Sequence, residues 1–277
     1  MKSLMIVIGF IFIFSLSAQA QKKEKIKGDK EVISVSEEII KSFNKIEVSD
    51  NIELELQKGS RNAYILSADR NLIEEVDVRV LDETLKISTR SKITNSKKLH
   101  LFLTFENLEH IIASDDAKIS NKGTLELDNL SLLASSSVRL DLDLRVLQNT
   151  EINLSGNSGG KLDLKSDHVL INMANRTDLK ANLNANKLEV NLEKSASLKL
   201  DGNAEECNYN LKGSSNLNAK KLQSQRAVLN SKNNTDIYVN ASKSIQVSAE
   251  GKSKVYVYGN PEIEVIGLTE KSRIIKK

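Results

Sequence analysis

The chain has 277 residues, of which 39% are hydrophobic and 28% are charged, and its formal net charge is +3. This apolar content can form a substantial core, which excludes a disordered chain, and the even mixture of 40 basic and 37 acidic residues excludes a nucleic-acid-binding footprint. With one Pro, no Trp and only 4% aromatic residues, the core is expected to be aliphatic and thin.

Residues 1–20 have the pattern of a signal peptide. Lys2 precedes an apolar run from Leu4 to Leu16, and Ala18-Gln19-Ala20 forms a small-x-small cleavage site. The apolar run is shorter than the roughly 20 residues that a membrane-spanning helix needs, so cleavage is favoured over an uncleaved anchor. The protein is therefore expected to be exported, to the periplasm, the outer-membrane surface or the medium.

Residues 21–42 form a lead-in segment. Its first part, up to Lys30, is polar and rich in Lys, which predicts a flexible stretch. The following residues, from Val32, fit either an edge strand or the start of a helical turn, and the sequence does not decide between them.

Residues 43–98 alternate between apolar and polar side chains, beginning with Phe43, Ile46 and Val48. This alternation, interrupted by short turns, predicts a β-meander. Within the meander, Asp69 is expected to cap one helical turn that runs through Glu74. Because the meander leads directly into the repeats that follow, we expect it to cover their first end as a cap that is continuous with them.

Residues 99–277 contain an apolar triplet, formed by alternate positions, that returns every 18 to 20 residues. Alternation is the period of a strand with one buried face, and a fixed interval is typical of stacked repeats. The predicted fold class is therefore all-β, namely a parallel β-solenoid (β-helix) with an N-terminal β-meander cap. The triplets are Leu130/Leu132/Ala134, Thr150/Ile152/Leu154, Val169/Ile171/Met173, Leu188/Val190/Leu192, Cys207/Tyr209/Leu211, Ala227/Leu229/Ser231, Ile245/Val247/Ala249 and Ile263/Val265/Gly267.

A second series of apolar positions lies between the triplets and keeps the same interval, so each coil is expected to contain two strands. Its members include Leu198/Leu200, Leu217/Ala219 and Ile237/Val239. The segments that join the coils are small and polar, such as Ser135-Ser136-Ser137, and these residues tolerate tight turns.

Cys207 is the only cysteine, and it falls on an inward position between Leu188 and Ala227 in the predicted column. A lone thiol cannot form an internal disulfide, and a small buried side chain is its commonest role. Near the end of the chain, Pro261 is expected at a turn or an edge. The basic tail from Lys271 to Lys277 is expected to discourage end-to-end stacking of two molecules.

Several segments together resemble a known family, the putative auto-transporter adhesins with a head GIN domain, which occur in the cell envelopes of Bacteroidetes-type bacteria. The resemblance spans roughly residues 43 to 265, and it implies an exported β-helical domain with an adhesin-like role. Auto-transporters carry a carboxy-terminal membrane barrel, and we expect none within this chain. The segments that carry the resemblance are Phe43–Val48, Ile52–Leu56, Ala68–Ile73, Val80–Ile87 and Tyr258–Pro261.

Asp141, Asp143 and Asp163 form the best candidate cluster for catalysis, because β-solenoids also occur as polysaccharide lyases and hydrolases and these reactions need paired carboxylates. The same outward column is expected to continue through Lys180 and Lys199, as in a solvated face of alternating charge. We therefore favour a structural role for the three aspartates.

No other motif predicts chemistry. The histidines His100, His110 and His168 are far apart, and at least two coils should separate the last two. Metal-binding, nucleophile and phosphate-binding motifs are missing from the sequence. We therefore predict no catalytic residue, no cofactor and no metal site.

One outward column of asparagines is more informative. Stacked amides on successive coils can form hydrogen bonds along the axis, as in the Asn ladders of cross-β structures. A structural ladder is the simpler interpretation, and a flat polar strip that contacts a ligand through many equal groups is the functional one. Asn208 and Asn175 would widen such a strip. The members of the column are Asn153, Asn172, Asn191, Asn210 and Asn230.

The sequence therefore predicts a non-catalytic exported β-helical protein, an adhesin-like or scaffold module of the cell envelope. Its expected partner is a cell-surface glycan or another protein, and not nucleic acid. The alternative is a carbohydrate-processing enzyme, a polysaccharide lyase or hydrolase built on a β-helix.

Overall fold

The computed structural model describes residues 23–277. The predicted signal peptide over residues 1–20 and the first two residues of the lead-in lie outside this range. Within it, no helix is long and apolar enough to cross a membrane.

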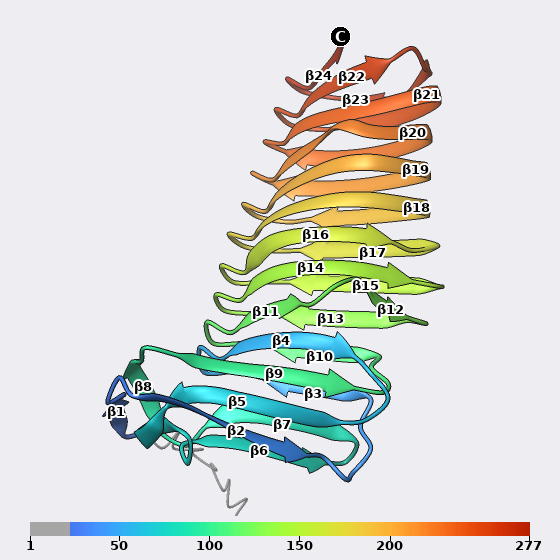
Figure 1. Cartoon of the computed structure of the whole chain (residues 1–277). Helices are drawn as coiled ribbons and strands as arrows, with labels where there is room; N and C mark the ends of the chain where they lie inside the picture. The colour runs from blue at the N-terminus through green and yellow to red at the C-terminus, as the bar shows by residue number, and fades with distance from the viewer. Residues whose placement is uncertain (1–22) are drawn as a thin grey trace, which may run out of the picture.

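Strands account for nearly all regular structure, and they stack into a rod (Figure 1). The first end contains β1 (Lys25–Lys27), β2 (Val32–Glu38), β3 (Lys45–Val48), β4 (Glu53–Lys58), β5 (Ala63–Asp69), the 3-10 turn η1 (Arg70–Leu72), β6 (Val76–Leu81), β7 (Thr84–Thr89), β8 (Lys92–Asn95) and β9 (Leu99–Phe105). The next coils contain β10 (His110–Ala113), β11 (Lys118–Asn121), β12 (Leu125–Leu127), β13 (Leu130–Ala134), β14 (Arg139–Val146), β15 (Asn149–Leu154), β16 (Gly159–Lys165) and β17 (His168–Met173). The last coils contain β18 (Asp178–Leu192), β19 (Ser197–Gly213), β20 (Asn216–Asn233), β21 (Asp236–Ala249), β22 (Lys254–Gly259), β23 (Glu262–Leu268) and β24 (Arg273–Lys276).

Each coil contributes strands to two faces of the rod, and neighbouring strands within each face run parallel. One face carries the column of asparagines, and we call it the ladder face. It contains β3, β10, β13, β15, β17, the second halves of β18 to β21, and β23. The opposite face contains β4, β11, β14, β16, the first halves of β18 to β21, β22 and β24. This arrangement confirms the predicted all-β class and the parallel β-solenoid.

The core lies between the two faces and consists of stacked apolar columns. Ile152, Ile171, Val190 and Tyr209 are directly opposite one another in register and are at most 2% exposed. Alternation supplies the column because only every second side chain of a strand points inward. Full burial of one aliphatic side chain stabilises the fold by about 1.5–3 kcal/mol. Because each inward side chain is covered partly by the side chains of the adjacent coils, every coil depends on its neighbours for this stabilisation.

The turns between coils also stack. In one turn column, successive coils each place a residue with positive φ at the same point, as Ser136, Asn175 and Lys194 show. The N–H of the residue that follows then donates to the carbonyl of the turn residue one coil earlier, for example Arg176 to Gly156. The polar turns predicted from the sequence therefore continue the hydrogen bonding of the sheets around the edge of the rod.

Strand pairing at the first end is mixed. The β2–β5, β5–β9 and β6–β7 pairs are antiparallel, whereas β3 and β4 pair in parallel with strands on both sides, β7 and β10 for β3 and β9 and β11 for β4. A pure meander contains only antiparallel neighbours, so the predicted cap already includes a coil of the solenoid type. The division into cap and solenoid remains a prediction.

Two local expectations at this end were wrong. The described part of the lead-in is not a free segment, because β1 pairs with β8 and β2 pairs with β5. Ile26 packs against the core. The sequence did not indicate this contact, because the residues around Ile26 are polar. The helical turn η1 does follow Asp69, but the Asp69 side chain makes no capping hydrogen bond.

The last predicted triplet is also corrected. Ile263 and Val265 continue their columns opposite Ile245 and Val247, but a bulge then places Gly267 opposite Ser248. Leu268, rather than Gly267, therefore takes the inward position opposite Ala249. A bulge adds one residue to one strand only, which a fixed interval cannot reveal.

Candidate functional site

The asparagine column predicted from the sequence is a hydrogen-bonded ladder. Nδ2 of each later residue donates to Oδ1 of the earlier one, over 2.8 Å for Asn172 to Asn153 and for Asn191 to Asn172. The series continues over 2.9 Å from Asn210 to Asn191 and 3.1 Å from Asn230 to Asn210. We call these five residues the Asn ladder. Its first four members are half-buried and Asn230 is exposed.

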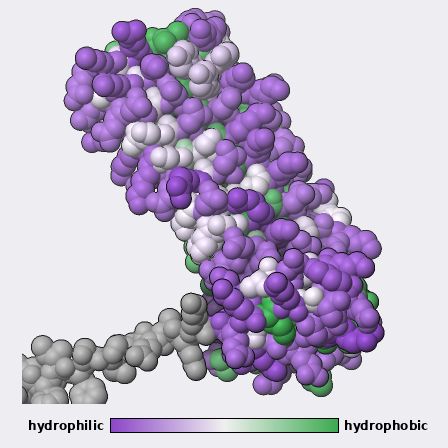
Figure 2. Space-filling view, turned by 90° about the vertical axis from the view of Figure 1, so that its left-hand side faces the viewer, coloured by the Kyte–Doolittle hydropathy of each residue, from purple (hydrophilic) through white to green (hydrophobic). Residues whose placement is uncertain are grey.

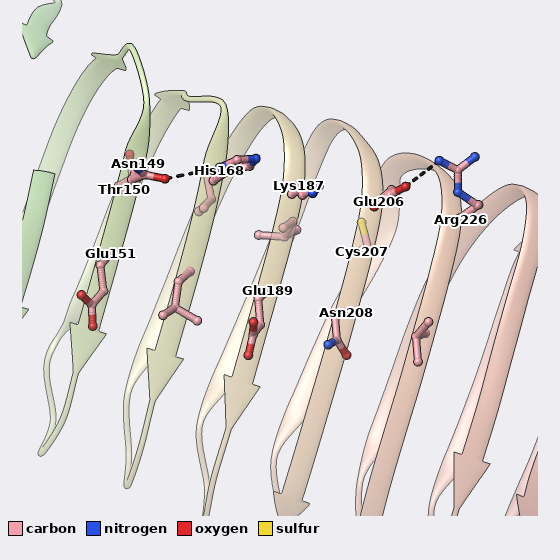
Figure 3. A pocket seen from close by; sticks show the side chains of 14 residues that line it. Asn149, Thr150, Glu151, His168, Lys187, Glu189, Glu206, Cys207, Asn208 and Arg226 are labelled. Carbon is pink, nitrogen blue, oxygen red and sulfur yellow. Dashed lines mark hydrogen bonds and ion pairs between the residues drawn. The ribbon is translucent and has the colours of Figure 1, made fainter. Parts of the chain in front are cut away.

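A trough of about 690 Å³ lies on the same face, beside the ladder (Figure 3). It runs across β15, β17 and the second halves of β18, β19 and β20, between two outward columns. The column nearer the ladder contains Glu151, Leu170, Glu189, Asn208 and Val228, each two residues before a ladder asparagine. We call it the middle column. It is mixed in character, with Val228 40% exposed.

The column on the far side of the trough contains charges of both signs. Its members are Asn149, His168, Lys187, Glu206 and Arg226. Arg226 donates to Glu206 over 2.6 Å, and this hydrogen bond, together with the positive charge, holds the pKa of the Glu206 carboxyl below its usual value. Arg226 and Glu206 thus form an ion pair. Lys187, the other cation of the column, forms no ion pair within residues 23–277.

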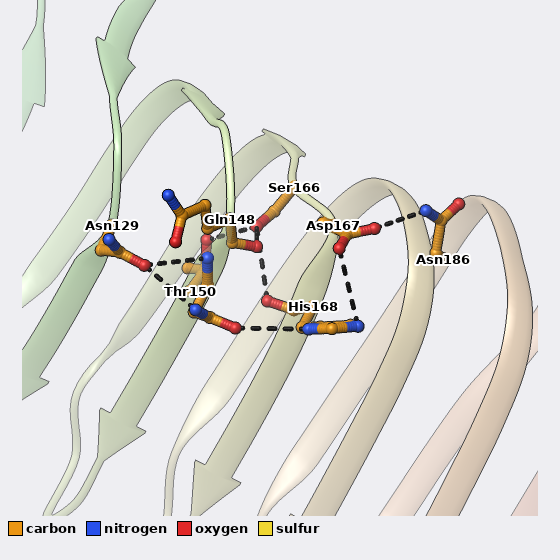
Figure 4. Close-up of polar contacts among 8 residues, drawn as sticks. Asn129, Gln148, Thr150, Ser166, Asp167, His168 and Asn186 are labelled. Atoms are coloured by element: carbon orange, nitrogen blue, oxygen red, sulfur yellow. Dashed lines mark hydrogen bonds and ion pairs between the residues drawn. The ribbon is translucent and has the colours of Figure 1, made fainter.

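A chain of polar contacts fixes the corner where these strands begin (Figure 4). Asn129 Oδ1 accepts from Asn149 Nδ2 over 3.1 Å, and Asn149 Oδ1 lies 3.3 Å from His168 Nδ1. The other ring nitrogen, Nε2, is 3.6 Å from Asp167, which also accepts from Asn186. These contacts connect four coils, so they hold the rim of the trough in place.

A second hollow, of about 240 Å³, lies on the other side of the ladder. It is lined by Leu133, Asn153, Asn172 and Asn191, among other residues towards the turn. The ladder therefore stands as a ridge between two hollows. Of the two residues expected to widen the strip, Asn208 lines the trough, whereas Asn175 lies in the turn and accepts from Lys194.

The aspartate cluster is only partly assembled. Asp143 and Asp163 are opposite each other on the opposite face, but Asp141 lies in the next column, opposite Lys161. All three are exposed. Asp143 accepts from Thr124 and Asp163 accepts from Asn182, both over 2.8 Å, so each carboxylate is held by a neighbouring coil.

The histidines and the cysteine lie where the sequence predicts. Two coils, those of β13 and β15, separate His110 from His168. Cys207 is 4% exposed and lies between Leu188 and Ala227, and burial raises the pKa of its thiol to about 11. Within residues 23–277, no group of His, Cys, Asp and Glu side chains is arranged to hold a metal ion.

Comparison with known proteins agrees with this architecture. A family model described as "putative auto-transporter adhesin, head GIN domain" matches residues 42–166 and again residues 146–261. The chain belongs to this family. The resemblance carried by Phe43–Val48 and the other four segments is thereby confirmed.

Solved structures share the fold of this GIN-domain chain. A putative adhesin from Parabacteroides merdae ATCC 43184 is 19% identical, with a TM-score of 0.71 over 92% of this chain and 99% of that one. A putative adhesin from Parabacteroides distasonis ATCC 8503 is 18% identical, with a TM-score of 0.68 over 92% and 100%. A putative lipid binding protein from the same strain is 16% identical, with a TM-score of 0.67 over 92% and 100%. No curated protein matches the chain.

The sequence reasoning missed the middle column as a unit. Its members differ in type, from Glu151 to Leu170 to Val228, so no single residue type repeats. The sequence nevertheless contains the information needed, because each member precedes a ladder asparagine by two residues and must therefore point to the same side of the sheet. Extending the period of the ladder by two positions would have found it.

Proposed function

We propose that this chain is an exported, non-catalytic rod that binds an extended ligand across several coils of its ladder face. Such a role makes it an adhesin-like module of the cell envelope, in agreement with the name of its family. The expected ligand is a glycan, with a protein partner as the other candidate. Export is supported by the signal-peptide pattern of residues 1–20.

The observation that carries this proposal is the position of the Asn ladder beside the trough. Four consecutive amide hydrogen bonds fix the ladder side chains before any ligand arrives, so little side-chain entropy is lost on binding. A regular array also offers several similar contacts to a chain molecule, and linked weak contacts add to a useful affinity. Both properties suit an extended ligand better than a compact one.

A carbohydrate-processing enzyme is the alternative, and the structure gives it little support. Asp141 is paired with Lys161 across the sheet rather than with the other two carboxylates, and the three side chains are exposed. Acid catalysis by a carboxyl group usually needs burial that raises its pKa. A screen of glycans that found turnover, lost in Asp163→Asn, would favour the enzyme instead.

The test is binding of purified mature protein to a glycan panel and to cells, compared with a triple variant Asn172→Ser, Asn191→Ser and Asn210→Ser. We expect the variant to lose binding while remaining folded. A matched control carries Asn182→Ser, Asn184→Ser and Asn203→Ser on the opposite face, where the same change should leave binding intact. If the wild type binds nothing, or if both variants bind equally well, the ladder face is not the ligand site.

Location provides an independent check. A protease or antibody accessibility assay on intact cells should reach the protein if it is displayed at the surface. Protection in intact cells and access after the outer membrane is opened would place it in the periplasm, which excludes adhesion to other cells.

A further inference from the structure

Three lysines are stacked on consecutive coils of the opposite face, those of β16, β18 and β19 (Figure 1). Lys161 is directly opposite Lys180, and Lys180 is directly opposite Lys199. Neighbouring strands are about 4.8 Å apart, and like charges placed opposite each other destabilise a sheet. The column therefore differs from the alternation of charge that the sequence suggested, and a negative charge beside it would be stabilising.

Cations elsewhere in the rod obtain such a charge from the next coil. In three places a cation is directly opposite an anion and forms an ion pair with it over 2.6 to 3.0 Å, namely Lys118–Glu53, Arg145–Glu126 and Arg226–Glu206. The lysine column is different. Lys199 lies 3.9 Å from Asp201. Within residues 23–277, Lys161 and Lys180 form no ion pair, although Asp141 is opposite Lys161 in the sheet.

A hollow of about 300 Å³ lies beside the first two lysines. Gly159 occupies the adjacent outward column, between Arg139 on the preceding coil and Asp178 on the following one. Since a glycine has no side chain, this position leaves room between its two neighbours. Four cations and one anion line the hollow, and they are Arg139, Lys161, Arg176, Lys180 and Asp178.

The guanidinium group of Arg139 is held in place at the edge of this hollow. Its Nη1 donates to the backbone carbonyl oxygens of Asn157 over 2.6 Å and of Val138 over 3.2 Å. Within residues 23–277, no acceptor takes the N–H groups of Nη2 or Nε, and the side chains of the other three cations donate to no acceptor either. The hollow therefore gathers donors from three coils that the described chain leaves unused.

We infer that this hollow is a binding site for a phosphate group, which is free or is carried by a sugar or a lipid. A phosphate monoester has about 1.5 to 2 negative charges at pH 7 and three acceptor oxygens, so it can contact several cations at once. Arg139 supplies planar paired donors, and Lys161 and Lys180 supply point charges from two coils. A carboxylate has one charge and two oxygens, and it would leave more of these donors unused.

The site is separate from the Asn ladder, because it lies on the opposite face of the rod. The inference therefore does not rest on the proposed function, and the two can fail independently. Binding at the ladder face is expected to be the same whether or not the hollow holds a phosphate.

Asp178 gives the inference a distinctive consequence. It is the one anion that lines the hollow, and it forms no ion pair within residues 23–277. A bound phosphate would be repelled by this carboxylate, whereas an amide of nearly the same shape would not repel it. Asp178→Asn should therefore strengthen binding, an effect that loss of folding cannot imitate.

The test measures binding to the mature protein by titration calorimetry at low ionic strength. The probes are inorganic phosphate, glucose 6-phosphate, glucose, and phosphatidylcholine vesicles with and without phosphatidic acid. A double variant, Lys161→Gln with Lys180→Gln, removes two cations of the hollow. Its matched control, Lys165→Gln with Lys221→Gln, removes the same charge from outward positions of the same face outside the hollow. Melting temperatures show that all variants, including Asp178→Asn, are folded.

We expect inorganic phosphate and glucose 6-phosphate to bind and glucose not to bind. The Lys161/Lys180 double variant should bind about tenfold more weakly or worse, as expected for the loss of charged hydrogen bonds, while the matched control changes affinity about twofold at most. Asp178→Asn should bind several-fold more tightly. Stronger binding of glucose 6-phosphate than of phosphate would identify a sugar as the carrier, and stronger binding to phosphatidic acid vesicles would identify a lipid.

Three results would overturn the inference. They are a wild type that binds no phosphate probe, equal losses in the two double variants, and weaker binding by Asp178→Asn. Glycan binding at the ladder face, measured on the same proteins, should be unchanged in every variant, so failure of the phosphate site leaves the proposed function standing.

Discussion

Asp69 shows how a single residue stabilises the first end of the rod. Its side chain is fully buried and accepts hydrogen bonds from the backbone N–H groups of Lys97 and Lys98, each over 3.0 Å, and of Lys30 over 3.2 Å. Burial alone would raise the pKa of this carboxyl, but the backbone donors outweigh it and lower the pKa below its usual value. The carboxylate therefore joins three segments of the chain as an anion.

Replacing Asp69 with Asn should destabilise the fold by about 2–3 kcal/mol at pH 7, because hydrogen bonds to a charged acceptor are lost. The folded pKa of Asp69 is lower than the unfolded one, so its contribution is complete above the unfolded pKa of about 3.9 and disappears as pH falls through the folded value. Urea unfolding of both proteins at pH 7 and pH 3 measures this. The difference between them should shrink in acid, and a constant difference would contradict the role of the charge. Exposed Asp163→Asn serves as the control.

Cys207 should be chemically inert in the folded protein. Burial raises the pKa of its thiol to about 11, so the reactive thiolate is scarce at neutral pH, and the side chain is only 4% exposed. A thiol reagent such as Ellman's reagent should react slowly with native protein and rapidly after unfolding in urea. Equal rates in both states would show that this column opens readily.

The sequence indicated Asp69 as a helix cap and Cys207 as a core residue, and only the second prediction was right. The cysteine follows from the period of its column, which is local information. The donors to Asp69 come from residues up to 39 positions away, in segments whose pairing no local pattern reveals.

At the scale of elements, two neighbouring coils approach each other closely at Gly160. A Cβ atom there would lie 2.0 Å from the carbonyl oxygen of Leu140 in the preceding coil. Gly123 also has a positive φ, of 67°, but a Cβ atom there would meet nothing within 4 Å. The two glycines therefore separate the effect of a clash from that of backbone strain.

Gly160→Ala should cost about 3 kcal/mol or more, because backbone atoms must move to relieve the overlap. Gly123→Ala should cost only about 1–2 kcal/mol, the usual penalty of the left-handed conformation. Thermal or urea unfolding measures both. Equal losses would mean that the coils can separate locally without penalty.

The Asn ladder should contribute to stability in proportion to the bonds that each member makes. Asn191 is bonded to Asn172, Asn210 and Glu189, whereas Asn230 at the end is bonded to Asn210 only. Asn191→Ala should therefore cost about 1–2 kcal/mol and Asn230→Ala about 0.5 kcal/mol, given partial exposure. A melting series of both variants tests this, and the opposite order would show that the ladder bonds are incidental.

The positions of the strands could be predicted wherever the repeat interval was constant. The register of Ile171, Val190 and Tyr209, and of the ladder beside them, follows from a constant interval of 19 residues. The bulge near Gly267 and the parallel pairing of β3 and β4 did not follow, because pairing partners are chosen by the tertiary arrangement.

At the scale of the molecule, the two ends of the rod differ. Antiparallel strands cover the first end, whereas among the described residues no coil lies beyond β23 and β24. Val265 and Leu268 occupy inward positions and are nevertheless 51% and 46% exposed. Hydrophobic residues are visible near both ends of the rod on a surface that is mostly hydrophilic (Figure 2).

The uncovered end should open first. We expect amide hydrogen exchange to be fastest in β23 and β24 and slowest in β19 and β20, because stability in a solenoid comes from neighbouring coils on both sides. Exchange followed by mass spectrometry on peptic peptides measures the order. Protection of β23 that rises with protein concentration would show that a second molecule covers this end, against the prediction made from the basic tail.

The direction of the hydrogen bonds between coils has a mechanical consequence. They run along the length of the rod, so a pulling force applied between its two ends loads the coils in series, and the weakest gives way before the others. Each released coil of 19 residues would supply up to about 65 Å of extended chain, at roughly 3.4 Å per residue. A rod built in this way should lengthen under tension one coil at a time and shorten again as the released chain folds back onto the remaining coils.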